Sequence, residues 1–162
     1  MRAAIVADTH MPRGSRRLPQ ACLERLHGAD LIVHVGDFVT AAVLAEIASI
    51  GPPVAAVYGN VDDEALRRDL PEERVLEIAG ARVGLVHDAG PARGRLRRLR
   101  RRFPDADAAI FGHSHLPLHE REGDFQIFNP GSPTERRRAP HRSMGLATVA
   151  QGTIHFEHVA LD

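Results

Sequence analysis

The sequence predicts an α/β fold with a mixed sheet arrangement. Three short apolar runs, residues 3–7, 31–35 and 54–58, end in polar residues and are separated by helical patterns, and strands that alternate with helices indicate a parallel sheet. In the second half of the chain, pairs of apolar runs joined by short turns indicate antiparallel hairpins. A length of 162 residues suits one domain with its own core, and no repeat or linker divides the chain. We therefore expect a single domain, residues 1–162.

The boundaries of the elements follow from caps and breakers. A helix over residues 19–27 has Pro19 in its first turn, and a second over residues 40–50 begins at Thr40 and stops before Gly51-Pro52-Pro53. An Arg-rich helix is expected over residues 92–103. The remaining predicted strands, with Ala79-Gly80-Ala81 between the first two, are residues 74–78, 82–87, 108–111, 118–121, 125–129, 144–150 and 153–160. Residues 133–142 are polar and rich in Arg and Pro, which predicts a loop.

Composition excludes several classes of function. The 21 basic residues balance 21 acidic ones, so the net charge favours neither nucleic acid nor a membrane as a bulk partner. All basic residues are Arg, which excludes a lysine nucleophile. The lone Cys22 has no partner for an internal disulfide, and the apolar N-terminal run is far too short for a signal peptide or a membrane span. We expect a soluble, cytoplasmic protein.

Polar residues that can bind metal follow the predicted strands. Asp8 and His10 lie two residues apart, as do His113 and His115, so each pair can direct two ligands to one ion. Asp37 can bridge two cations through its separate oxygens, while Asn60 and His87 offer an amide oxygen and an imidazole. This mixture suits Mn, Fe, Co, Ni or Zn, whereas calcium favours all-oxygen sites and structural zinc favours thiolates.

The order of these residues resembles that of the calcineurin-like metallophosphoesterases over nearly the whole chain. The matching blocks are Asp8-Thr9-His10, Gly36-Asp37, Gly59-Asn60, His87 and Gly112-His113-Ser114-His115. The small size and three further segments are most similar to the YfcE-type phosphodiesterase branch: Gly59-Asn60-Val61-Asp62, Gly112 to Pro117, and Asn129-Pro130-Gly131-Ser132. The resemblance implies a four-layer fold, a β-sandwich of two mixed sheets flanked by helices.

The resemblance also implies a ligand set for two divalent metal ions. Asp8, His10, Asp37 and His115 would hold one ion, and Asp37, Asn60, His87 and His113 the other, with Asp37 shared. Manganese is the first candidate, and iron, nickel, cobalt and zinc are compatible. The implied reaction is hydrolysis of a phosphate ester, a diester rather than a monoester, by a metal-bridging hydroxide without a phosphoenzyme. Asp37, Asn60 and His87 are the expected catalytic residues, and the expected partner is a small, nucleotide-like phosphorylated substrate.

Several features depart from the pattern or leave alternatives open. Val61 stands where many relatives carry a histidine that protonates the leaving group, and Asp88 stands where glycine is frequent. Arg136-Arg137-Arg138 is a candidate contact for an anionic substrate, and Asn129 to Ser132 is read as a turn. The alternative functions are a protein-interaction scaffold like the related retromer subunit and a nuclease that uses the Arg-rich helix, with nucleic acid not favoured as partner. A homo-oligomer is compatible with the sequence.

Overall fold

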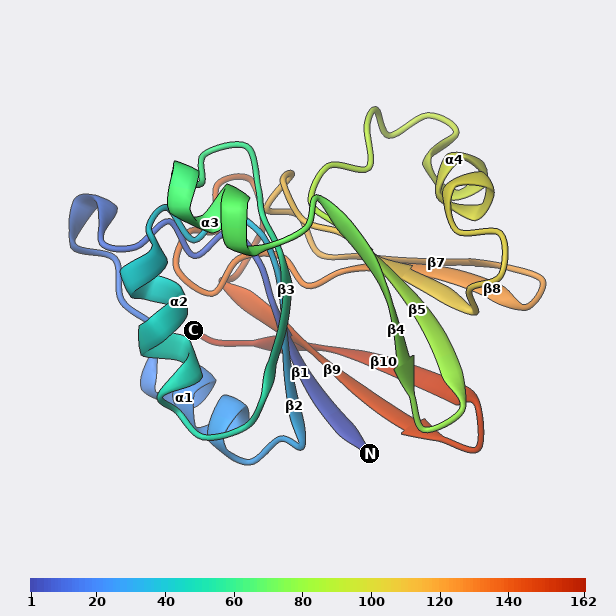
Figure 1. Cartoon of the computed structure of the whole chain (residues 1–162), viewed down its shortest axis with the longest axis horizontal. Coiled ribbons are helices and arrows are strands. Elements are labelled where there is room, and N and C mark those ends of the chain that lie inside the picture. Colours follow the sequence, from blue (N-terminus) through green and yellow to red (C-terminus); the bar gives the residue numbers. More distant parts are fainter.

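The computed structural model describes all residues from Met1 to Asp162 and contains two five-stranded mixed sheets packed face to face (Figure 1). The first sheet has the strand order β10-β9-β1-β2-β3 and the second has the order β4-β5-β6-β8-β7. The first sheet comprises β1 (Arg2–Val6), β2 (Leu31–Val35), β3 (Val54–Val57), β9 (Ser143–Ala150) and β10 (Thr153–Ala160). The second comprises β4 (Glu73–Ile78), β5 (Ala81–Val86), β6 (Ala108–Ile110), β7 (Leu118–Glu122) and β8 (Phe125–Asn129).

The parallel part of the first sheet is the part that the alternating strand and helix pattern predicts. β1, β2 and β3 pair in parallel, so their carboxyl ends meet at one edge. The connecting helices α1 (Gln20–His27), α2 (Ala41–Ala48) and α3 (Glu64–Asp69) cover the outer face of this sheet. The sequence reading missed α3, which has only six residues and begins at Asp63, whose side chain accepts the N–H of Leu66.

The second sheet contains two hairpins and one helix. β4 and β5 are antiparallel, and the two residues between them, Ala79 and Gly80, both have positive φ, the conformation of a tight hairpin turn. β7 and β8 form the other hairpin. The helix α4 (Arg95–Arg102) packs Leu99 against the outer face of this sheet, together with Phe103 just beyond it. The four layers implied by the resemblance are therefore present.

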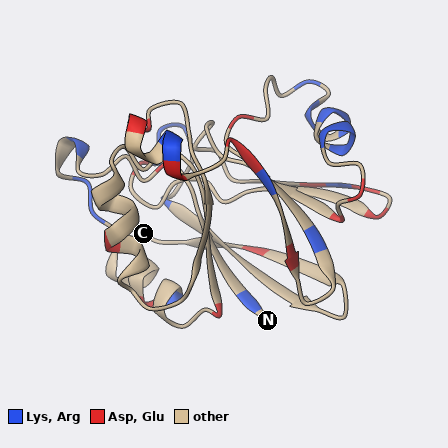
Figure 2. Ribbon diagram, viewed as in Figure 1, with Lys and Arg blue, Asp and Glu red and all other residues tan.

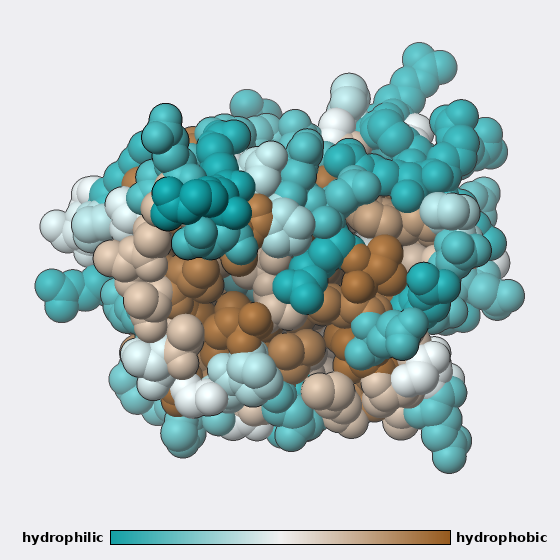
Figure 3. Space-filling model, viewed as in Figure 1, coloured by the Kyte–Doolittle hydropathy of each residue, from teal (hydrophilic) through white to brown (hydrophobic).

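Alternation along the strands divides the core into three apolar layers. Ala3, Ile5 and Ala7 face the second sheet, while Ala4 and Val6 face the helices, as the two-residue period of a strand requires. The largest cluster, with 19 buried residues, lies between the sheets. On the face seen in Figure 3, apolar surface remains around the edge strands β3 and β4. No helix is long and apolar enough to cross a membrane.

Candidate metal centre

All seven predicted ligands lie beyond the carboxyl ends of strands, at one edge of the sandwich. Asp8 and His10 follow β1, Asp37 follows β2 and Asn60 follows β3, all from the first sheet. The second sheet contributes the others: His87 follows β5, and His113 and His115 follow β6. The structure therefore brings together residues that are more than 100 positions apart in the chain, as His113, whose N–H donates to Asp8 Oδ1, illustrates.

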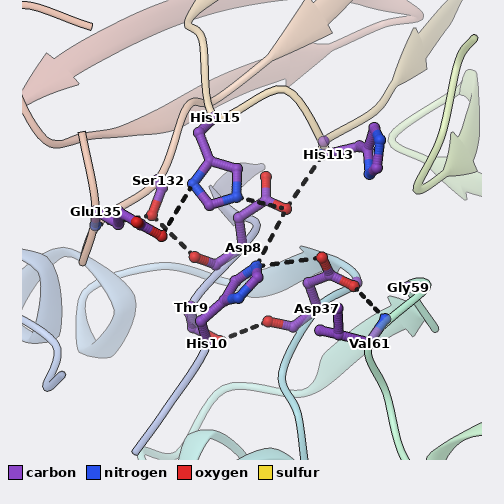
Figure 4. Close-up of polar contacts among 12 residues, drawn as sticks. Asp8, Thr9, His10, Asp37, Gly59, Val61, His113, His115, Ser132 and Glu135 are labelled. Atoms are coloured by element: carbon purple, nitrogen blue, oxygen red, sulfur yellow. Dashed lines mark hydrogen bonds and ion pairs between the residues drawn. The ribbon is translucent and has the colours of Figure 1, made fainter. Parts of the chain in front are cut away.

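A first cluster joins Asp8, His10 and His115. One potential ligand atom from each lies within 4.8 Å of the others, and all three residues are buried. His115 Nε2 is 3.6 Å from Asp8 Oδ1, and the His10 and His115 rings are 5.0 Å apart between centroids. Figure 4 shows the two imidazoles beside the Asp8 carboxylate.

A second cluster joins Asp37, His87 and His113, again within 4.8 Å. Asn60 belongs to it, because its Oδ1 lies 3.1 Å from His87 Nε2 and 3.0 Å from His113 Nδ1. Asn60 and His113 are exposed, whereas Asp37 and His87 are buried. The second cluster is thus the side of the centre that solvent reaches.

Asp37 stands between the two clusters. Its Oδ2 lies 3.2 Å from His10 Nε2 in the first cluster and 3.2 Å from His87 Nε2 in the second. We expected its two oxygens to face the two ions separately, but Oδ1 accepts the N–H of Val61 and is turned to the backbone. A single oxygen therefore faces both clusters.

The backbone at the ligands adopts a conformation that most residues avoid. Five of the seven, Asp8, His10, Asp37, His113 and His115, have positive φ, between 46° and 69°. Each such residue costs of order 1–3 kcal/mol, and residues of this kind concentrate at functional sites. Aspartate and histidine tolerate this region better than most residues, so the sharp turns that converge the side chains are compatible with these residue types.

The glycines in the motifs allow the ligand loops to touch. A Cβ on Gly59 would lie 2.1 Å from Asp37 Oδ1, and one on Gly36 would lie 2.7 Å from His87 Nδ1. Both distances are far below any real contact of a Cβ, so these positions accept only glycine while the ligands stay in place.

Asp62 binds the loops that carry Asp37 and Asn60. Its carboxylate accepts the N–H groups of Asp37 at 3.1 Å, Val39 at 2.8 Å and Gly59 at 2.7 Å. Burial raises the pKa of Asp62, and the backbone donors oppose this effect. Asp62 therefore fixes two ligand loops at once.

Sequence reasoning missed a second set of supporting residues, which lies in the predicted turn Asn129 to Ser132 and at the start of the loop that follows it. The Asn129 side chain donates to Gly112 O at 2.9 Å and accepts the N–H of Gly131. The Ser132 hydroxyl donates to Asp8 O at 2.9 Å, and that of Thr134 donates to Thr9 O at 2.8 Å. This segment therefore positions ligand loops from both sheets, and only its recurrence in the resembled family pointed to it.

The charges of the centre favour a cation. Burial lowers the pKa of His10, but the neighbouring Asp37 and Asp8 outweigh it and raise that pKa to about 9. Burial also acts to lower the pKa of His87, but the same two carboxylates outweigh it and raise that pKa. Burial lowers the pKa of His115. Burial acts to raise the pKa of Asp37, yet His10 and His87 hold it far below its usual range. The carboxylates thus attract positive charge to this centre, and a divalent cation that binds there would compete with protons for His10 and His87.

The donor set fits a divalent metal. Asp8 Oδ2 is buried and has no hydrogen-bond partner, and His10 Nε2, although 3.2 Å from Asp37 Oδ2, makes no hydrogen bond of good geometry; such atoms are costly unless something binds them. The donors are carboxylate, amide oxygen and imidazole, with no thiolate, since Cys22 lies buried in the core beside the helices. This combination suits borderline divalent ions.

Comparison with known proteins agrees with this geometry. Residues 1–152 match the family model of the calcineurin-like phosphoesterase superfamily domain. The chain belongs to this family. It is 34% identical over 139 residues to a probable metallophosphoesterase from Methanothermobacter thermautotrophicus, an alignment that covers 85% of this chain and 80% of the relative.

Two further proteins are similar to this chain. A phosphodiesterase from Methanocaldococcus jannaschii is 24% identical, with 81% of this chain and 83% of that protein covered. A crystal structure of Vps29 from Entamoeba histolytica complexed with Zn²⁺ matches over 100% of both chains, with a TM-score of 0.79 and 24% identity. The match to Vps29 shows that the fold is shared.

The departures from the family pattern have local explanations. Val61 donates its N–H to Asp37 and supplies no proton-transferring side chain. Asp88 is exposed and accepts the N–H of Gly90 at 2.7 Å, so it closes a turn.

Two of the predicted substrate-contacting arginines, Arg136-Arg137-Arg138, have partners within their own loop. Arg137 lies 3.6 Å from Glu135, which contacts His115, whereas Arg136 donates to Pro140 O.

The arginines of α4 form the strongest concentration of positive charge (Figure 2). Several of them already have partners within the chain. Arg98 donates to the carbonyl of Ala89, Arg102 pairs with Glu73, and Arg95 and Arg100 stack over aromatic rings. The grooves beside the helix are also lined by acidic residues of the β7–β8 hairpin, Glu120, Glu122 and Asp124. This helix therefore offers less free positive charge than its sequence suggests.

Proposed function

We propose that this protein is a dinuclear-metal-dependent phosphodiesterase. The observation that carries the proposal is the position of Asp37 Oδ2, 3.2 Å from a histidine nitrogen of each cluster. An oxygen in this position can be shared by two ions, with Asp8, His10 and His115 around one and Asn60, His87 and His113 around the other. When bound, two such ions supply a hydroxide nucleophile at neutral pH and stabilise the charge that develops on the phosphoryl oxygens.

The protein residues then contribute position rather than covalent chemistry. The Nδ1–H of His87 donates to Val35 O at 2.7 Å, which directs Nε2 toward Asp37 and Asn60. Asn60 adds a ligand without charge, so the open side of the centre does not gain a carboxylate that would repel an anionic phosphate. Asp37, Asn60 and His87 are the residues that we assign to catalysis.

The lack of a protein acid limits the leaving group. Val61 occupies the position at which many relatives carry a histidine that protonates the leaving group, so here water must donate that proton. We therefore propose that esters with good leaving groups react fastest. The exposed Asn60 and His113 give a substrate with two ester arms access to the second cluster, and a relative is a phosphodiesterase. Both support a small diester with a nucleotide-like character as substrate. For the ions, manganese remains our first candidate.

The proposal is tested with bis-p-nitrophenyl phosphate and p-nitrophenyl phosphate in the presence of Mn²⁺. We expect metal-dependent hydrolysis of the diester above that of the monoester, abolished in Asp37→Ala and His113→Ala and unaffected in the exposed-surface control Glu73→Gln. Inactivity on both esters, with two bound ions per chain demonstrated by elemental analysis, would overturn the proposal and favour a protein-interaction scaffold.

A further inference from the structure

His115 has one nitrogen whose role the two clusters do not explain. Its Nε2 faces Asp8, but its Nδ1 is buried and makes no hydrogen bond. His87 shows the contrasting arrangement, because its Nδ1 lies 2.7 Å from the Val35 carbonyl while Nε2 faces the ligands. A histidine that binds metal through one nitrogen carries a proton on the other, and that N–H needs an acceptor.

Glu135 is the acidic group beside this nitrogen. Its Oε2 lies 3.6 Å from His115 Nδ1, as Figure 4 shows. The Glu135 backbone is fixed close by, since its N–H donates at 3.0 Å to the same Ser132 hydroxyl that donates to Asp8 O. One serine thus holds the loop of a ligand and the loop of Glu135 together. A small rotation of the glutamate side chain brings its carboxylate within hydrogen-bond distance of the imidazole.

Two arginines hold the Glu135 carboxylate in place from its other side. Arg16 lies 3.2 Å from Oε1, and Arg137 lies 3.6 Å from Oε2. Burial acts to raise the pKa of Glu135, but Arg16 and Arg137 outweigh it and hold that pKa below its usual value. The group is about a quarter exposed, so it is an acceptor at the boundary between the centre and solvent.

We infer that Glu135 is a positioning residue of the first cluster. Its carboxylate accepts the Nδ1–H of His115 and so directs Nε2 to the ion beside Asp8. The inference rests on the metal centre of the proposed function. It also makes the clusters unequal. The first has Asp8, the shared Asp37 and Glu135 behind His115, whereas the second has the shared Asp37 and a neutral Asn60. The first cluster is therefore the tighter site.

The inference is tested by calorimetric titration of metal-stripped protein with Zn²⁺. Glu135→Gln and Glu135→Ala are compared with Glu73→Gln, since Glu73 is also paired with an arginine but is exposed and lies on β4 away from the centre. We expect the tighter binding step to weaken about 10- to 100-fold in Glu135→Ala, less in Glu135→Gln, and not at all in Glu73→Gln. The weaker step should stay unchanged. In the zinc-loaded protein, the hydrogen-bonded Nδ1–H resonance of His115 should be present in the wild type and lost in Glu135→Ala.

Three outcomes would overturn the inference. They are an unchanged tighter step in both Glu135 variants, a retained Nδ1–H resonance, and a metal-free Glu135→Gln protein less stable than the control, which would indicate a structural role. If wild-type protein binds Zn²⁺ in this way but hydrolyses neither test ester, the proposed function fails while the role of Glu135 stands. If wild-type protein binds no metal, both fail.

Discussion

Gly59→Ala tests whether the position of Asp37 governs the centre. Gly59 does not have a positive φ, so alanine is compatible with its backbone, and the effect is one of space alone. The added Cβ would lie 2.1 Å from Asp37 Oδ1 and 2.4 Å from Asp37 N. Oδ1 is held by the N–H of Val61, so the carboxylate must move by about 1 Å and give up this bond, and the Asp37 and Gly59 backbones must also separate, to regain ordinary contact.

The expected losses in stability and in kcat/KM follow from this displacement. Forcing a methyl group into a packed site costs about 1–3 kcal/mol of stability, which a domain of this size tolerates. A misplacement of about 1 Å in catalytic geometry costs on the order of 100-fold in rate. We therefore expect Gly59→Ala to fold, to bind the shared ion more weakly and to lose about two orders of magnitude in kcat/KM.

The assay is kcat/KM for bis-p-nitrophenyl phosphate at saturating Mn²⁺, with unfolding followed in parallel. Gly28→Ala is the matched control, because Gly28 also has an ordinary φ of −84° and its Cβ would meet only Glu24 O at 3.3 Å, at the end of α1. A Gly59→Ala protein that folds and has the same kcat/KM as Gly28→Ala would refute the view that Asp37 must lie where the structure places it.

Three other predictions concern the surroundings of the centre. Ser132→Ala removes the shorter of the two hydroxyl bonds to the Asp8 carbonyl and the acceptor of the Glu135 N–H, and we expect a loss of about 1–3 kcal/mol in the free energy of unfolding measured with urea; a loss no greater than in the exposed Ser49→Ala contradicts this. Burial lowers the pKa of His34 from 6.5 in the unfolded chain to about 3 in the folded protein. Below pH 6.5 the unfolded chain therefore binds a proton that the folded protein does not, and the free energy of unfolding falls as the pH falls toward 3, by about 2 kcal/mol at pH 5. The wild type should therefore lose more stability than His34→Gln between pH 8 and 5, and parallel pH profiles would contradict the assignment. Mn²⁺ at 100 times its Kd should stabilise the wild type by about 2.7 kcal/mol per site, and an equal increase in Tm for Asp37→Ala would count against the shared ligand.

The convergence of the candidate ligands could be predicted because their positions depend on local rules. Asp8, Asp37 and Asn60 each follow an apolar strand, and the carboxyl ends of parallel strands meet at one edge. The chemistry of the candidate donor atoms, carboxylate, amide oxygen and imidazole, follows directly from the residue types. The hairpin turn at Ala79 and Gly80 was equally local.

The supports could not be predicted, because they depend on contacts that only the folded chain creates. The Ser132 hydroxyl reaches Asp8 O across 124 residues, and the Asp62 carboxylate reaches the N–H of Asp37 across 25. The orientation of the Asp37 carboxylate could not be predicted for the same reason, since it is set by the N–H of Val61 in another loop. The six-residue α3 lacks the length at which a periodic pattern becomes visible.

The placement of the centre between the two sheets links its geometry to the fold. Each cluster takes ligands from both sheets, Asp8 with His115 in one and Asp37 with His87 in the other. Apolar packing is not directional, so by itself it permits one sheet to slide over the other. Hydrogen bonds have a preferred geometry and oppose such sliding. Here His87 Nδ1 lies 2.7 Å from Val35 O, and Ser132 donates to Asp8 O. These bonds fix the register of the sandwich at the edge where the ligands lie. The strained backbone at the ligands can persist because contacts from both sheets restrain it, so an ion bound there would reinforce an alignment that the protein already holds.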